Sequence, residues 1–174
     1  MKKFILVVCL IGIFFFLTEV AESAYVLPYP SYLPGNKLYK VSELIDGIKK
    51  YWHFGTLTQL KYVQEMSDKH LVEAKTLFEY KQYALGVMAL EKSNGEVSKM
   101  PQILMKLQNE RKNNADVIKK VKEEMSVHAK VLTRMFSEVP DSIDWTEERE
   151  RSRVINFSKL FKDAADLRKT VLSN

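Results

Sequence analysis

Apolar residues recur every three or four positions from Lys37 almost to the end of the chain, and this spacing is the strongest constraint on the fold. In the first such segment the recurring residues are Leu38, Val41, Leu44, Ile45, Ile48 and Trp52. This spacing puts side chains on one face of an α-helix, whereas a half-buried strand needs strict alternation. No segment alternates over a useful length. The sequence therefore predicts an all-α protein whose apolar helix faces form the core.

The helix boundaries follow from local signals. Phe54 and Gly55 end the first helix, Glu79 to Gln82 interrupt the second, and Pro101 fits the first turn of a helix that begins near Ser98. Asp144 followed by Glu147 resembles a capping box that would open the last helix. The predicted helices cover residues 37–53, 56–79, 83–107 (with the new start near Ser98), 114–136 and 144–171. About five helices with short connections predict an antiparallel bundle or an array of helical hairpins.

The N-terminus has the pattern of a secretory signal peptide. Lys2 and Lys3 precede an apolar stretch from Phe4 to Leu17, which is shorter than the roughly 20 residues of a membrane span. Ala21 and Ser23 are small residues at the spacing that signal peptidase reads, so we expect cleavage after Ser23. Export across the inner membrane follows, to the periplasm, the cell surface or the medium. The alternative is an uncleaved N-terminal anchor.

Residues 24–36 form a second segment, which we predict to be an extended arm. Proline fixes φ and biases the preceding residue toward extended backbone, and this segment interleaves Pro28, Pro30 and Pro34 with Tyr25, Tyr29 and Tyr32. We expect the arm to pack along the first two helices. The alternative is an aromatic groove for a peptide or a glycan. The predicted organisation is thus a signal peptide (1–23), the arm (24–36) and a helical domain (37–174).

A search for catalytic or metal-binding patterns in the sequence gives no motif. The only cysteine, Cys9, lies in the signal segment, the glycines are isolated, and no serine stands in a Gly-x-Ser-x-Gly elbow. Glu124 precedes His128 by one helical turn, a spacing more typical of a surface hydrogen bond than of a metal site. We therefore predict a protein that is not an enzyme and that has no cofactor.

Positive charge is concentrated in residues 99–134. This segment has nine Lys and Arg against four Asp and Glu, so it accounts for the whole net charge of +5. An anionic membrane surface or a cell-wall polymer would attract such a segment, and the signal peptide argues against nucleic acid. The candidate contact residues are Lys106, Arg111, Lys112, Lys119, Lys120, Lys122, Lys130 and Arg134.

The stretch from Leu27 to Lys40 resembles the opening of an uncharacterised family of bacterial extracytoplasmic helical domains, a domain of unknown function. The resemblance extends over residues 27–92, and its opening motif comprises Leu27, Pro28, Tyr29, Pro30, Leu33, Pro34, Leu38 and Tyr39. Gly47 departs from the pattern, because a longer side chain is expected there. The resemblance implies a helical domain in the cell envelope, and it transfers no catalytic residue. We expect the motif residues to pin the arm to the bundle.

These observations together favour a secreted or envelope-located helical protein that binds or scaffolds an unknown protein or envelope polymer. The alternative is binding to a membrane surface or a cell-wall polymer through residues 99–134.

Overall fold

The computed structural model describes residues 25–28, 32–34, 36–110, 114–145 and 153–173. In these ranges the protein has six helices and one two-stranded sheet. The helices are α2 (Tyr39–Trp52), α3 (Thr56–Glu79), α4 (Tyr83–Val97), α5 (Met100–Asn109), α6 (Ala115–Ser137) and α7 (Phe157–Ser173). The strands are β1 (Ser142–Trp145) and β2 (Arg153–Asn156). The all-α fold class predicted from the sequence is confirmed.

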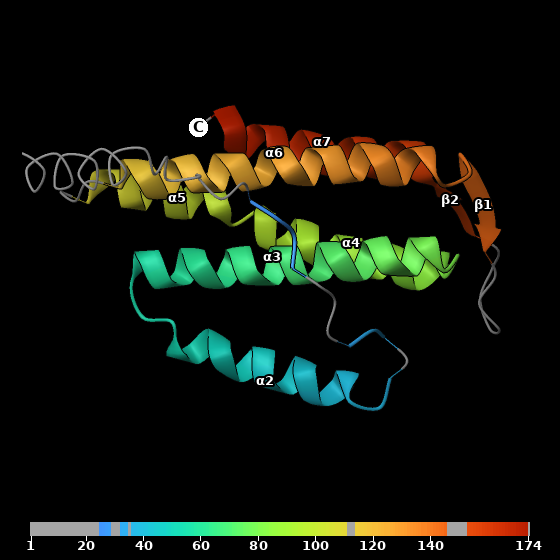
Figure 1. Ribbon diagram of the computed structural model, residues 1–174, viewed down its shortest axis with the longest axis horizontal. Helices are drawn as coiled ribbons and strands as arrows, with labels where there is room; N and C mark the ends of the chain where they lie inside the picture. The colour runs from blue at the N-terminus through green and yellow to red at the C-terminus, as the bar shows by residue number, and fades with distance from the viewer. Residues whose placement is uncertain (1–24, 29–31, 35, 111–113, 146–152, 174) are drawn as a thin grey trace, which may run out of the picture.

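The helices form an antiparallel array (Figure 1). α3 and α4 make one hairpin, and α6 and α7 make a second that packs against the first. α5 extends beyond the end of α4, and the β1–β2 hairpin connects α6 to α7 at the other end of the molecule. α2 lies along the outer side of α3, away from α6 and α7.

Most helix boundaries lie where the local signals predicted them. Gly55 precedes α3 with a positive φ of 92°, a conformation that favours glycine. The turn after α3 is closed by backbone hydrogen bonds from Lys81 to Phe78 and from Gln82 to Leu77. Pro101 lies in the first turn of α5. Ser98 and Lys99 separate α5 from α4, which explains why the count exceeds the expected five.

The last helix begins later than predicted, because the segment before it forms a β-hairpin. Asp144, the expected helix cap, pairs with Val154 in the antiparallel ladder, and α7 starts only at Phe157. Ile143 and Ile155 pair with each other and pack against the core, which holds both strands in place. The cap is Asn156, whose side-chain oxygen accepts a hydrogen bond of 2.8 Å from the Lys159 backbone N–H.

Two apolar clusters make up the core, one toward each end of the bundle. The first core cluster comprises Leu71, Ala74, Leu77, Phe78, Ala89, Leu90, Leu132, Met135, Phe157, Phe161 and Ala164. The second comprises Leu60, Val63, Val97, Met100, Leu104, Leu107, Val121, Met125 and Val171. On each of α3, α4, α6 and α7, polar side chains occupy the positions between the two clusters.

Candidate functional site

Buried polar residues separate the two core clusters, and we call them the polar layer. The polar layer comprises Gln64, Ser67 and Asp68 on α3, Ser93 and Asn94 on α4, Glu124 and His128 on α6, and Arg168 on α7. Six of the eight are buried, and Gln64 and Asn94 are half-buried. Burying polar groups costs free energy unless they are paired, so each pairing in the layer matters.

Asp68 is the centre of one half of the polar layer. Its Oδ1 lies 2.7 Å from His128 Nε2, and its Oδ2 accepts a hydrogen bond from the Tyr25 hydroxyl. The Tyr25 ring also lies 6.4 Å from the His128 ring, centroid to centroid. The start of the predicted arm therefore covers this part of the layer, contacting α3 and α6.

Glu124 is one of three members of the layer with a buried atom left unpaired in the described ranges, the others being His128 (Nδ1) and Arg168 (Nε). Its side chain is 3% exposed, Oε2 accepts a hydrogen bond from Gln64, and Oε1 has no hydrogen-bond partner among the described residues. Burial and the nearby negative charge of Asp68 raise the pKa of Glu124 to about 8. Burial lowers the pKa of His128, with Asp68 acting in the opposite direction.

Arg168 anchors the other half of the layer. The guanidinium is fully buried and donates to Asn94 Oδ1 (2.7 Å), Ser93 Oγ (2.9 Å) and the carbonyl of Ala164 (2.9 Å). Ser93 in turn donates to the carbonyl of Ser67 on α3. Its hydrogen-bond partners are neutral, and burial lowers the pKa of Arg168 to about 10, with the charge of Asp68 acting in the opposite direction. Arg168 therefore ties α7 to the α3–α4 hairpin.

The pairing expected for Glu124 and His128 is not what the structure has. Both side chains are buried, and His128 bonds to Asp68 across the bundle. Ligand atoms of Asp68, Glu124 and His128 lie within 4.8 Å of one another, and these residue types can hold a metal ion. Asp68 stands 60 positions before His128, and no spacing rule links such distant residues. Sequence reasoning therefore missed the third member.

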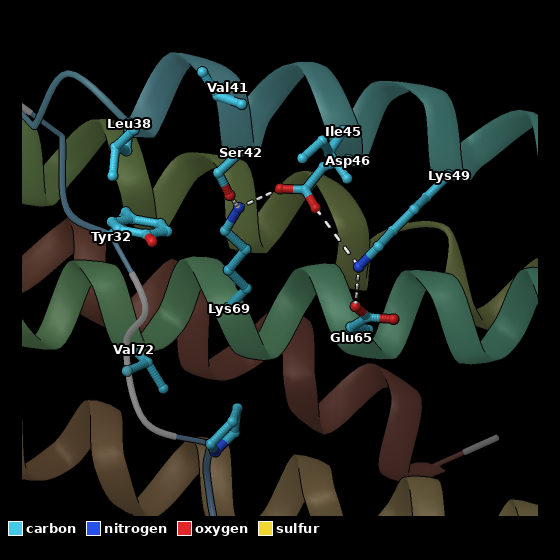
Figure 2. A pocket seen from close by; sticks show the side chains of 11 residues that line it. Tyr32, Leu38, Val41, Ser42, Ile45, Asp46, Lys49, Glu65, Lys69 and Val72 are labelled. Atoms are coloured by element: carbon cyan, nitrogen blue, oxygen red, sulfur yellow. Dashed lines mark hydrogen bonds and ion pairs between the residues drawn. The ribbon is translucent and has the colours of Figure 1, made fainter.

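A second feature is the way α2 contacts the bundle. Figure 2 shows the polar side of α2 turned toward α3, with Lys69 reaching both Ser42 and Asp46. Lys49 Nζ lies 2.7 Å from Glu65 Oε1, and Glu43 Oε1 lies 2.5 Å from Lys92 Nζ. Ionic and polar contacts thus hold this helix.

An exposed apolar stripe runs beside these polar contacts and over the outer side of α2, and we call it the α2 apolar face. It comprises Leu38, Val41, Leu44, Ile45, Ile48 and Trp52, which are 47–76% exposed. The expectation that these residues form the core is therefore wrong. The amphipathic pattern is present, but the polar side faces α3. A cavity of about 450 Å³ lies between α2 and α3, lined in part by Leu38, Val41 and Ile45.

The motif residues of the arm lie in different surroundings. Leu27 and Leu33 pack against the first core cluster, and Pro28 lines the cavity beside α2. Pro34 is half-buried, whereas Leu38 is half exposed. Tyr29 and Pro30 lie outside the described residues.

Tyr39 is the one buried residue of α2. Its hydroxyl lies 3.4 Å from Glu73 Oε2 on α3 and 3.4 Å from Lys92 Nζ on α4. Burial, with the nearby charge of Glu73, raises the pKa of Tyr39 to about 12. The hydroxyl is therefore neutral at physiological pH, and it links the start of α2 to the α3–α4 hairpin.

The candidate basic residues lie on α5 and on α6. Lys106, Lys119, Lys120, Lys130 and Arg134 are exposed, Lys122 is half-buried, and Arg111 and Lys112 lie outside the described residues. Acidic neighbours neutralise part of this charge. Lys119 Nζ lies 3.7 Å from Glu123 Oε1, and Arg134 Nε lies 3.0 Å from Glu138 Oε1.

Three comparisons with known proteins bear on identity. The model of one family, described as Domain of unknown function (DUF5667), matches residues 31–128, which include α2 to α5 and α6 as far as His128. Neither the curated proteins nor the solved structures gave a match. In the described part of the chain, no helix has the length and apolar character needed to cross a membrane. The family match covers more than half of the chain, so the protein belongs to this domain-of-unknown-function family (DUF5667).

Proposed function

We propose that the protein is an exported, non-enzymatic binding module that docks on a lipid membrane surface through the α2 apolar face. The single observation that carries the proposal is the orientation of α2. An amphipathic surface helix normally turns its apolar stripe toward the core. Here the apolar stripe is exposed, and the contacts that hold the helix on α3 are polar.

The apolar face supplies the driving force for docking. Contiguous exposed apolar surface on a folded protein marks an interaction site. Fully burying one Val, Leu or Ile side chain is favourable by about 1.5–3 kcal/mol. Leu44, Ile45 and Ile48 are 65%, 50% and 47% exposed, so each can contribute about half of this free energy or somewhat more.

The C-terminal end of α2 adds residues suited to the membrane–water interface. Tyr51, Trp52 and Phe54 are 75%, 76% and 82% exposed. Amphipathic aromatic rings are enriched at the level of lipid headgroups, and basic residues beside an apolar face attract anionic lipid. Lys40 and Lys50 are exposed on the same helix.

The shape of the surface favours a bilayer over a protein groove as the partner. α2 lies at the outer edge of the array, and none of the other helices that the structure describes flanks its outward side (Figure 1). A bilayer adapts to a convex helix without a complementary cleft. Export, as predicted from residues 1–23, would bring the protein to a membrane surface.

The alternative surface, the basic residues of 99–134, has weaker support. Lys119 and Arg134 each lie beside a carboxylate, which reduces the charge available for lipid. This segment therefore supplies the matched control.

The test is sedimentation with vesicles, using the chain that begins at Ala24, which keeps every described residue. We expect binding to vesicles of phosphatidylcholine with anionic phosphatidylglycerol. Ile48→Asp should abolish binding, because it places a charge at the centre of the α2 apolar face. Since Ile48 is 47% exposed, this variant should retain the fold, to be checked by circular dichroism.

Two outcomes would contradict the proposal. Equal sedimentation of Ile48→Asp and the parent chain would show that α2 is not the contact surface. Loss of binding in the double variant Lys120→Gln, Lys130→Gln, with no effect of Ile48→Asp, would transfer the function to the basic segment.

A further inference from the structure

We propose that Asp68, Glu124 and His128 form a binding site for one divalent transition-metal ion, with Zn²⁺ as the expected occupant. The site lies between α3 and α6, in the middle of the polar layer. It is independent of the α2 apolar face, which lies on the outer side of α3.

The ligand atoms are close enough to share one ion. One atom from each residue lies within 4.8 Å of the other two. Zinc binds imidazole nitrogen and carboxylate oxygen at about 2.0–2.2 Å in tetrahedral geometry, so two ligands of one ion lie about 3.3–3.6 Å apart. His128 Nε2 and Asp68 Oδ1 lie 2.7 Å apart, so an ion would separate these two atoms as it replaces the hydrogen bond between them.

An unpartnered buried oxygen supports a bound cation at this position. Glu124 Oε1 has no hydrogen-bond partner in the described part of the chain, and Glu124 is only 3% exposed to solvent. A buried carboxylate oxygen without a partner is costly. A cation bound next to Asp68 and Glu124 would pair this oxygen and offset the repulsion between the two carboxylates.

Arg168, the permanent cation of the layer, does not take this role. Its guanidinium donates to Ser93, Asn94 and Ala164, and no hydrogen bond joins it to either carboxylate among the described contacts. The two carboxylates are therefore left with each other and with the Tyr25 hydroxyl, the His128 ring and the Gln64 amide as neighbours.

The ligand set selects the class of metal. Ca²⁺ and Mg²⁺ prefer sites made only of oxygen ligands, whereas imidazole suits zinc and its neighbours in the first transition row. Three protein ligands leave one zinc position for water or for a further oxygen. Tyr25 covers the site from the arm through its hydrogen bond to Asp68, so an ion here would also fix the arm against α3 and α6.

Binding of the ion requires a defined exchange of protons. The ligating nitrogen of His128 must present its lone pair, so the imidazole proton moves to the other ring nitrogen. Any proton held by the two carboxylates is released to water. No oxidant or reductant is needed.

The test uses the purified protein without a polyhistidine tag, treated with EDTA and dialysed. Calorimetric titration with Zn²⁺ should give one site per chain, and the thermal midpoint should rise by about 5 °C or more at saturating zinc. Ca²⁺ and Mg²⁺ should give no such rise. Glu124→Gln and His128→Gln should each weaken zinc binding at least about tenfold.

His70→Gln is the matched control, because His70 Nδ1 lies beside another buried glutamate, 3.0 Å from Glu73 Oε2, outside the polar layer. It should bind zinc as the parent protein does. Glu124→Gln keeps the size of the side chain and replaces a buried carboxyl group with a neutral amide, so it should fold, and circular dichroism checks this. Absence of zinc binding to the parent protein would overturn the proposal and leave a proton as the occupant. Equal zinc affinity in the parent protein and Glu124→Gln would overturn it as well.

Discussion

Two glycines inside helices have opposite surroundings, although their local sequences do not distinguish them. A Cβ added at Gly86 on α4 would lie 3.1 Å from ring carbons of Phe78 in the first core cluster. A Cβ at Gly47 on α2 would meet nothing within 4 Å. Gly86 therefore permits close packing of α4 on α3, whereas Gly47 only weakens its helix.

We predict effects of opposite sign when each glycine is replaced by alanine. Gly86→Ala should lower the free energy of unfolding by about 1–3 kcal/mol, because the Phe78 ring must move. Gly47→Ala should raise it by about 0.5–1 kcal/mol through helix propensity. Denaturant unfolding of the two variants measures both values. A stabilising Gly86→Ala would show that the Phe78 ring has room to shift.

Single residues also show how far the sequence could predict the polar layer. The spacing of Glu124 and His128 placed both on one helix face, which the structure has. Their burial depends on Asp68 and Tyr25, which approach only when distant segments pack together. Nothing in the sequence indicated that Arg168 is buried, because an arginine on a surface helix is usually exposed.

The starts and ends of helices that glycine or proline marks could be predicted from the sequence. The side of each helix that faces its neighbours could not. Hydrophobic periodicity shows which side chains share a face, but it does not show which side of the helix packs against its neighbour. For α2, the partners of Glu43, Asp46 and Lys49 lie on α3 and α4, at positions the pattern does not connect. The capping signal at Asp144 failed for the same reason, because pairing with Val154 is a non-local contact.

We predict that acid loosens α2 before the rest of the bundle. The hydrogen bond from Lys92 holds the pKa of Glu43 below its ordinary value of 4.5. A lowered carboxyl pKa stabilises the folded state above pH 4.5, and this contribution is lost as the pH falls through the lower, folded-state pKa. Glu43 and Lys92 are each 42% exposed, so the contribution is below about 1 kcal/mol.

Amide hydrogen exchange measures this local effect. Protection factors of α2 should be unchanged from pH 6 to pH 4.5 and fall below pH 4.5, while those of α3 and α4 stay high. Glu43→Gln should remove part of the change, and the control Glu79→Gln, at an exposed pair within α3, should not. Loss of protection in all helices together would refute a separately held α2.

For the molecule as a whole, the apolar core extends beyond the residues that the family match covers. Phe157, Phe161 and Ala164 belong to the first core cluster and Val171 to the second, and all four lie on α7. The match ends at His128. The folding unit therefore includes the C-terminal hairpin and α7, which contribute to both clusters.

We predict that a chain ending at Ser137 does not fold cooperatively. Its loss of α7 exposes both core clusters and leaves Ser93 and Asn94 without the Arg168 guanidinium. Thermal unfolding followed by circular dichroism should show no sharp transition, in contrast to a chain that lacks only residues 1–23. A sharp transition at the parent midpoint would show that α7 is dispensable.

The position of the polar layer, midway between the two clusters on four helices, fixes how the helices align along their lengths. Sliding α7 by one turn would move the Arg168 guanidinium about 5.4 Å along its axis and into apolar surroundings. Leucines and phenylalanines alone would tolerate such a shift, because one apolar contact can replace another. A buried charge that leaves its hydrogen-bond partners finds no replacement for them among apolar side chains. The polar layer thus fixes the register of the helices. It selects one alignment of this helical array among several that the apolar residues alone would allow.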